Sequence, residues 1–190
     1  FDIREGLLSR HLRFRHGDRV TAVTQRRFVS MADPHVGALE TTFKAENWAG
    51  RLEVESGIDG DVENSGVERY AALEGRHLET LATGEPDPES LFLQARTMQS
   101  RIRIAEAVRT CVHRREEKID VDRELIEEPD RIAHRMTVEL EEGEVATVEK
   151  VMTLYTAMDQ AISESGTEAR LHLRSLPRFS DLLRRHILEI

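Results

Sequence analysis

Apolar and polar residues alternate with a period of two along most of the chain, from residue 12 to residue 156. This period is typical of β-strands that bury one face. In LETTFKA, Leu39, Thr41, Phe43 and Ala45 share one face, and the residues between them share the other. Similar alternation in RLEVES, SLFLQARTMQ, RIRIAEAVRTCVHR, RIAHRMTVEL and EVATVEKVMTLYT predicts roughly nine or ten strands.

Short turns separate these segments, which favours packed antiparallel sheets over a parallel α/β sheet. LRFR and VTAVTQRRFV flank His16-Gly17-Asp18, where we predict a hairpin turn. Two segments interrupt the pattern. Residues 83–90 (TGEPDPES) contain two prolines and predict a loop, and the charge-dense residues 114–130 predict an exposed excursion or a mobile hairpin.

The period changes after residue 157. A short helix is predicted from Thr167 to Ser175, and a second one follows Pro177. The apolar face of the second helix is predicted to comprise Phe179, Leu182, Leu183, Ile187 and Ile190. We therefore expect a mainly β fold, with an antiparallel β-sandwich over residues 1–160 and a C-terminal helical segment over residues 161–190.

Composition limits the functions that this fold could serve. The 190 residues suffice for one domain with a sizeable core. With 36 acidic and 27 basic residues the net charge is −9, which speaks against nucleic acid as the main partner. The single cysteine, Cys111, excludes an internal disulfide and fits a reducing, cytoplasmic location. No run approaches the ~18 apolar residues that span a membrane, and no signal peptide is recognisable.

The two ends of the chain bear on its organisation. It starts at Phe1 without an initiator methionine and ends at Ile190 within an amphipathic pattern. We therefore expect a domain of a longer protein.

Chemistry-bearing motifs are sparse. The histidines stand at positions 11, 16, 35, 77, 113, 134, 172 and 186, without a close pair at ligand spacing. The sequence lacks an HExxH motif, a Walker glycine loop and a GxSxG elbow. No pair of carboxylates has a spacing that marks glycoside chemistry. We therefore predict neither a metal site nor a catalytic residue.

A few single residues have two readings. Trp48, the sole tryptophan, could stack on a sugar ring or anchor the core beside a turn. His134 lies on an apolar strand face, where a hydrogen-bonded core histidine is expected rather than a catalyst. The segment from Asp33 to His35 is interpreted as a tight loop in which Asp33 caps backbone N–H groups, rather than as an acid–base pair.

Three segments of the chain together form a specific pattern. They run from Ser30 to His35, from Asn47 to Gly50 and from Asp59 to Tyr70. This pattern resembles the N-terminal β-domain of glycoside hydrolase family 65, which includes the trehalose, maltose and kojibiose phosphorylases and related α-glucoside hydrolases. Ala49 stands where that family more often has serine. Weaker likeness in residues 2–10, 147–155 and 179–186 extends the resemblance over most of the chain, although residues 114–130 do not match well.

The resemblance implies a galactose-mutarotase-like super-sandwich that precedes an (α/α)6 catalytic barrel. The general-acid glutamate and the phosphate site of such enzymes lie in the barrel, so no catalytic residue is carried over to this chain. The implied function is that of a non-catalytic domain of an inverting α-glucoside phosphorylase or hydrolase. It would support the barrel and help to shape a cleft for an α-glucoside disaccharide. It would also contribute to oligomerisation, and a homodimer is one implied assembly. The full-length enzyme, if a phosphorylase, would use inorganic phosphate as co-substrate and no cofactor.

Two alternatives belong to other classes of function. One is a stand-alone carbohydrate-binding module with Trp48 and Tyr70 as stacking platforms. The other is a mutarotase- or epimerase-like enzyme in which His77 or His134 and a carboxylate act as acid and base.

Overall fold

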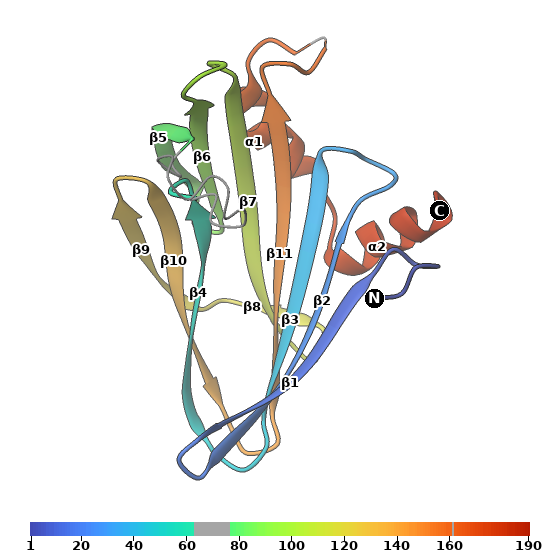
Figure 1. The fold of residues 1–190 in the computed structure, drawn as a ribbon. Helices are drawn as coiled ribbons and strands as arrows, with labels where there is room; N and C mark the ends of the chain where they lie inside the picture. Colours follow the sequence, from blue (N-terminus) through green and yellow to red (C-terminus); the bar gives the residue numbers. More distant parts are fainter. Residues whose placement is uncertain (63–76, 161) are drawn as a thin grey trace, which may run out of the picture.

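The computed structural model describes residues 1–62, 77–160 and 162–190, which form eleven β-strands followed by two helices (Figure 1). The strands are β1 (Leu8–His16), β2 (Arg19–Val29), β3 (Val36–Ala45), β4 (Gly50–Asp59), β5 (Leu78–Asp87), β6 (Ser90–Thr97), β7 (Arg103–Arg114), β8 (Glu117–Ile119), β9 (Asp122–Glu128), β10 (Arg131–Leu140) and β11 (Val145–Thr156). The helices are α1 (Ser165–Ser175) and α2 (Phe179–Leu188).

The strands of the described chain form two antiparallel sheets. The large sheet has the order β1-β2-β3-β11-β7-β6-β5, with β8 attached to β7, and the small sheet has the order β4-β10-β9. The last long strand, β11, lies in the middle of the large sheet between β3 and β7, where Glu149 is paired with Glu40 on one side and with Cys111 on the other. The predicted mainly β, antiparallel fold with C-terminal helices is confirmed.

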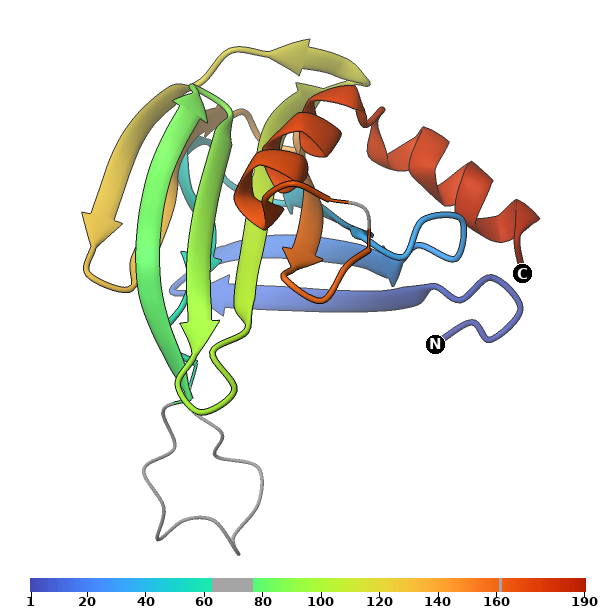
Figure 2. The same cartoon turned by 90° about the horizontal axis from the view of Figure 1, so that it is seen from above.

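Each face of the large sheet has its own hydrophobic core. Side chains such as Val112, Val148, Met136 and Val138 are buried between the large and small sheets. Cluster members on the opposite face include Phe28 and Val151 of the sheet together with residues of α1 and α2. The helices and the small sheet therefore lie on opposite sides of the large sheet, as Figures 1 and 2 show. Two-residue alternation in the central strands reflects these two environments.

The predicted hairpin at Gly17 is confirmed, because β1 and β2 pair over nine residue positions and Gly17 has a positive φ of 59°. The predicted loop at residues 83–90 is wrong over most of its length, since β5 continues to Asp87. Register shifts between β5 and β6 accommodate Pro86, and β5 is an edge strand of the sheet, where a missing N–H is tolerated.

Residues 114–130 are also more regular than predicted. They form β8 and β9, which pair with β7 of the large sheet and β10 of the small sheet respectively. This segment therefore crosses from one sheet to the other. Its weak alternation follows from its exposure, because five of the seven residues in β9 are solvent-exposed and no apolar face is required there.

The predicted apolar face of α2 needs one correction. Phe179, Leu182 and His186 are buried on the sheet, whereas Ile187 and Ile190 are 37% and 55% exposed. The buried residues follow the spacing i, i+3, i+7 of one helical stripe, and the histidine occupies the position for which the sequence suggested isoleucine.

His186 joins the two ends of the chain. Its Nδ1 accepts a hydrogen bond from the N–H of Met31 at 2.9 Å, and its Nε2 lies 2.9 Å from the carbonyl oxygen of Glu5. Gly6 has a φ of +56°, and a Cβ at this position would lie 2.8 Å from the imidazole. The N-terminal turn therefore requires glycine here, and the two termini lie side by side (Figures 1 and 2).

Candidate functional site

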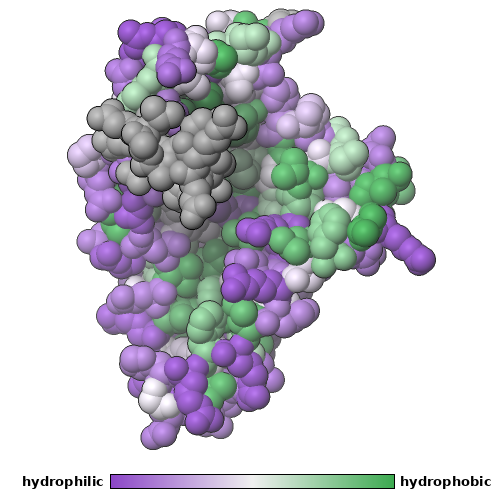
Figure 3. Space-filling model, in the orientation of Figure 1, coloured by the Kyte–Doolittle hydropathy of each residue, from purple (hydrophilic) through white to green (hydrophobic). Residues whose placement is uncertain are grey.

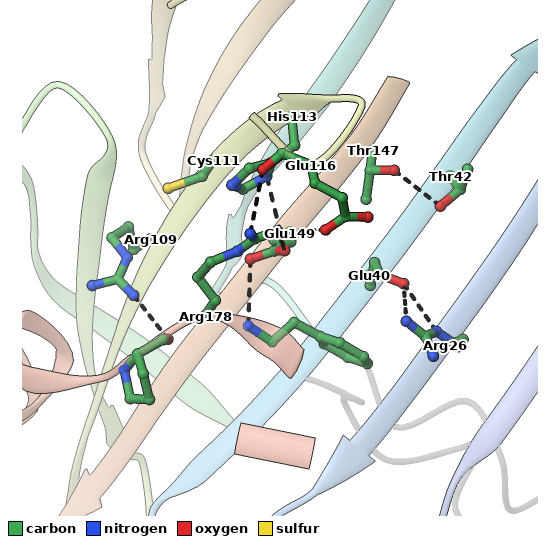
Figure 4. Close-up of polar contacts among 12 residues, drawn as sticks. Arg26, Glu40, Thr42, Arg109, Cys111, His113, Glu116, Thr147, Glu149 and Arg178 are labelled. Atoms are coloured by element: carbon green, nitrogen blue, oxygen red, sulfur yellow. Dashed lines mark hydrogen bonds and ion pairs between the residues drawn. The ribbon is translucent and has the colours of Figure 1, made fainter. Parts of the chain in front are cut away.

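The junction between α1 and α2 lies over a polar cleft on the large sheet. The cleft has a volume of about 390 Å³. Its charged and ionisable lining residues come from β7, β8, β11 and the loops beside them, and they are Glu89, Arg109, Cys111, His113, Glu116, Lys118, Glu149 and Arg178. Figure 4 shows that several of these side chains converge on the turn between the helices.

Glu149 anchors the start of α2. Its side chain is 4% exposed, and it accepts hydrogen bonds from Arg178 Nη2 at 2.9 Å and from the backbone N–H of Phe179 at 3.3 Å (Figure 4). Arg178 is the N-cap residue, and within the described chain its own side chain forms no cap hydrogen bond. The carboxylate of a neighbouring strand thus replaces the usual cap. It also places a negative charge at the positive end of the helix dipole.

Arg109 holds the other side of the junction. Its guanidinium donates hydrogen bonds to the carbonyl oxygens of Leu173, Leu176 and Pro177, at 3.2, 2.8 and 3.2 Å. These carbonyls belong to the end of α1 and to the turn after it, where backbone acceptors lack the i+4 N–H partner that they have inside a helix. A cation is favourable at this negative end of the helix dipole. Arg109 and Glu149 therefore form a clamp of opposite charges, which we call the junction clamp.

Arg178 connects the clamp to the surface. Besides Glu149, it contacts the side chain of Glu116 at 3.3 Å. The hydrogen bond with Glu149 is the main cause that raises the pKa of the Arg178 guanidinium above its ordinary value. The cation is thus held firmly in its charged form.

His113 completes the inner wall of the cleft. It is 4% exposed, and its Nδ1 lies 3.8 Å from Glu149 Oε1 without a hydrogen-bond partner among the described residues. Burial lowers the pKa of His113, although the negative charge of Glu149 opposes this effect. At neutral pH the ring is therefore neutral.

The polar groups at the mouth of the cleft are also paired. Lys118 Nζ donates to Glu89 at 2.7 Å, and this bond raises the pKa of Lys118. Cys111 lies 3.6 Å from the same carboxylate, and burial raises the pKa of its thiol. A protonated thiol is a poor nucleophile. These contacts describe a structural network rather than an activated catalytic group.

A second ion pair extends the network along one rung of the sheet. Arg26 on β2 and Glu40 on β3 are cross-strand partners whose side chains are 2.6 Å apart. Glu40 is in turn the neighbour of Glu149. Two adjacent carboxylates would repel each other, but each is neutralised by its own arginine. Arg26 also lies 5.1 Å from the centre of the Phe179 ring, so both arginines contact the start of α2.

No group of three or more His, Cys, Asp or Glu side chains in the described residues is arranged to hold a metal ion. Neither helix in that part of the chain is long and apolar enough to cross a membrane.

The structure places Trp48 in the core between the sheets. The residue is 8% exposed, and its indole N–H donates to the carbonyl of Val20 at 3.1 Å and to the hydroxyl of Thr21 at 3.0 Å. The guanidinium of Arg19 lies 5.7 Å from the ring centre. Tyr70, the second predicted stacking platform, lies outside the described residues. The sugar-stacking role of both residues stays a prediction.

The two histidines considered as acid–base groups are in different settings. His134 is 1% exposed, and its Nε2 lies 2.7 Å from the carboxylate of Glu85. This confirms a hydrogen-bonded core histidine. His77 is exposed, and its carbonyl accepts a hydrogen bond from the N–H of Met98.

Asp33 forms the predicted cap, because its Oδ1 accepts from the N–H of His35 at 3.0 Å. Its other oxygen lies 3.2 Å from Nε2 of His172 on α1. Nδ1 of the same ring lies 3.0 Å from the hydroxyl of Tyr155. The loop between β2 and β3 is therefore tied to the first helix, which the sequence did not suggest.

The sequence interpretation also missed the junction clamp. One signal was available for Glu149, because a glutamate stands at an interior position of the apolar run VATVEKVMT. A buried charge in such a strand needs a partner. Arg109 is likewise a charged residue inside a predicted strand. Nothing in the neighbouring sequence indicated which backbone carbonyls it would bind.

Comparisons with known proteins agree with this architecture. The family model for the glycosyl hydrolase family 65 N-terminal domain matches residues 1–190. An uncharacterized glycosyl hydrolase of Mycobacterium tuberculosis is 38% identical over 188 residues, which are 98% of this chain and 14% of that protein. Kojibiose phosphorylases of Halothermothrix orenii and Thermoanaerobacter brockii are 26% and 25% identical, over 88% and 98% of this chain and 21% and 25% of their own lengths. The chain thus spans a quarter or less of these relatives.

A solved structure assigned as a kojibiose phosphorylase from the human microbiome superposes with a TM-score of 0.79 at 16% identity. The superposition covers 98% of this chain and 23% of that one, and at this identity it shows the fold alone. The family model covers every residue of the sequence. The chain therefore belongs to the N-terminal domain family of glycosyl hydrolase family 65.

Proposed function

We propose that this chain is a non-catalytic domain of an inverting α-glucoside phosphorylase or hydrolase, and that it supports a catalytic barrel in the same polypeptide. The observation that carries the proposal is the junction clamp. Arg109 donates hydrogen bonds to carbonyls at the end of α1, and Glu149 accepts hydrogen bonds from Arg178 and from the N–H of Phe179 at the start of α2. They fix the direction of α2, the helix that follows the sheet in the chain. A rigid, oriented helix is what a supporting domain has to present to the region it supports.

The length of the relatives supports the same proposal. At least three quarters of each matched kojibiose phosphorylase lies outside the region that corresponds to this chain. The chemistry of an α-glucoside phosphorylase would then be carried by that larger part. The same reasoning assigns the disaccharide cleft, the homodimer contact and, for a phosphorylase, the binding of inorganic phosphate to the whole protein.

An activity assay tests the proposal. The full-length protein and the isolated 190 residues are each incubated with kojibiose, trehalose and maltose, with and without phosphate. We expect glucose or glucose phosphate to be released by the full-length protein alone. Kojibiose comes first among the substrates because two relatives carry it in their names. Circular dichroism of the isolated chain is the control for its folding, and turnover by a folded isolated chain would refute the proposal.

We also propose a reducing, cytoplasmic location for this protein. Its one cysteine, Cys111, is a free thiol that is partly buried beside Glu89. Fractionation of cells that express the full-length protein tests this, and recovery in an oxidising extracytoplasmic compartment would contradict it.

A further inference from the structure

An apolar groove lies on the part of the large sheet that the small sheet leaves uncovered. Its volume is about 730 Å³, and side chains of β1, β2, β3 and β11 line it, among them Leu8, Leu39 and Met152. Met152 also packs against the core cluster between the two sheets, which places the groove on the face opposite α1. The N-terminal turn and the end of α2 form its rim.

The rim is unusually apolar for a solvent-exposed surface. Phe1, Ile3, Val29 and Met31 are 76%, 80%, 72% and 63% exposed, and Ile190 is 55% exposed. Figure 3 shows apolar side chains gathered in the region where α2 and the N-terminal residues lie in Figure 1. A contiguous exposed apolar surface of this kind marks a contact site.

Two cationic side chains line the groove, Arg27 and Lys150. Arg27 is exposed and has no ion-pair partner among the described residues. Lys150 donates to the carbonyl of Gly57, which uses one of its three N–H groups. Glu106 on β7 is the acidic residue whose charge acts on Lys150. An arginine without an ion-pair partner in the described chain, placed beside a lysine in an apolar groove, favours an occupant that carries a carboxylate.

The geometry favours a helix over a strand as the occupant. The groove crosses the faces of four neighbouring strands. The backbone groups of the inner strands are already paired within the sheet, so an added strand would find no hydrogen-bond partners there. A helix needs side-chain contacts alone, and an apolar helical stripe on a sheet face is the usual way to cover such a surface.

We propose that this groove seats an amphipathic helix from the part of the polypeptide outside this domain, with one Asp or Glu of that helix facing Arg27 and Lys150. The proposal rests on the proposed function, because it takes the larger part of the protein as the source of the helix. In the relatives, the matched region is 14% to 25% of the polypeptide, which leaves ample chain to supply it. His186 and Ile190 of the α2 region border the groove, so the polypeptide passes next to it.

Photo-crosslinking in the full-length protein tests the occupant. A benzophenone amino acid replaces Met31 at the rim, and in a matched control it replaces Phe14, which is 57% exposed near the β1–β2 turn. We expect Met31 to crosslink within one polypeptide to a helical segment outside residues 1–190, and Phe14 not to reach that segment. Crosslinks between two copies, crosslinks confined to residues 1–190, or no crosslink at Met31 would each overturn the proposal.

Charge reversal tests the carboxylate. Arg27→Glu is compared with Arg15→Glu, which changes the same residue type on the exposed edge strand β1. We expect Arg27→Glu to lower the yield of the Met31 crosslink about five-fold, as the loss of a partly desolvated charge contact would. Arg15→Glu should leave the yield unchanged. Equal yields in the two variants would overturn the charge complementarity.

The crosslinking experiment and the activity assay can fail independently, so failure of the groove proposal can be distinguished from failure of the proposed function. Turnover by the isolated 190 residues would refute the supporting role whatever the crosslinks show. A crosslink between copies, together with an inactive isolated chain, would refute the groove assignment alone.

Discussion

At the scale of single residues, Glu149 shows how one buried charge can fix the junction between two helices and a sheet. It is almost fully buried on a central strand, and it satisfies a side chain and a backbone N–H of another element. Replacing it with alanine leaves the Phe179 N–H and the inner face of Arg178 without an acceptor. Because Arg178 is 40% exposed and can be partly rehydrated, we expect a loss of about 2 kcal/mol in the free energy of unfolding rather than more.

Urea denaturation of the 190-residue chain measures this loss. Glu116→Gln is the matched control, since Glu116 contacts the same arginine but is 90% exposed. Its effect should stay below about 0.5 kcal/mol. Equal effects of the two variants would show that burial of Glu149 does not contribute as described.

Trp48 belongs to the same scale. Its ring fills the core between the sheets and its N–H is satisfied there, so Trp48→Ala should lower the free energy of unfolding by about 3 kcal/mol or more. Trp48→Phe keeps most of the apolar volume and should cost less. Titration of the tryptophan fluorescence with glucose, maltose and trehalose is expected to give no saturable change at millimolar sugar. A saturable change would support the carbohydrate-binding alternative.

At the scale of elements, α1 depends on a glutamate cap that makes its stability sensitive to pH. Glu164 accepts hydrogen bonds from the N–H groups of Gly166 and Thr167 and from the Gln94 amide. Partial burial raises its pKa, but these hydrogen bonds outweigh that effect and lower the pKa from 4.5 to about 2. The folded state therefore binds the proton less tightly than the unfolded state, and the stabilisation is present above pH 4.5.

We expect Glu164→Gln to cost about 1 kcal/mol at neutral pH. The difference from the unmodified chain should shrink as the pH falls from 4.5 towards 2, because the carboxylate becomes protonated there. Denaturation at a series of pH values measures it. Glu168→Gln, in the first turn of the same helix, is the control and should cost about 0.3 kcal/mol. If the difference in free energy of unfolding between Glu164→Gln and the unmodified chain stayed constant down to pH 2, Glu164 would not be the cap described here.

The strands were predictable because their period is a direct consequence of burial on one face. Leu39, Phe43 and Ala45 lie on one face of β3 as their spacing predicts, where Phe43 and Ala45 pack towards the small sheet and Leu39 lines the apolar groove beside it. The β5 segment was misread because proline argues against a strand in general, whereas an edge strand with register shifts tolerates it. Whether a strand lies at the edge of a sheet depends on the order of all the strands. The alternation of apolar and polar residues within one segment does not reveal that order.

The junction clamp could not be predicted for a related reason. Arg109 and the carbonyls that it binds are separated by more than sixty residues, and Glu149 is thirty residues from Phe179. Their meeting depends on the register of β7 and β11 and on the angle at which α1 leaves the sheet. The sequence indicates that these charges need partners, but the fold alone decides which ones.

At the scale of the whole molecule, the helices and the large sheet share one hydrophobic cluster. Leu173 of α1 and Phe179 of α2 are buried with Phe28, Val36 and Val151 of the sheet. The clamp and the contact of His186 with the N-terminal turn add polar connections between the same elements. The helical segment is therefore packed as part of the body of the sandwich.

This unity predicts cooperative unfolding. Leu173→Ala removes a side chain that is 2% exposed, and it should cost about 3 kcal/mol in the free energy of unfolding. Hydrogen exchange should then show weaker protection in β7 and β11 as well as in α1, because all three open in one step. Leu171→Ala, on the same helix at 54% exposure, is the matched control and should cost less than about 0.5 kcal/mol. If α1 lost protection while the central strands kept theirs, the helices would be a separately unfolding attachment, and they could not brace a neighbouring barrel through the sheet.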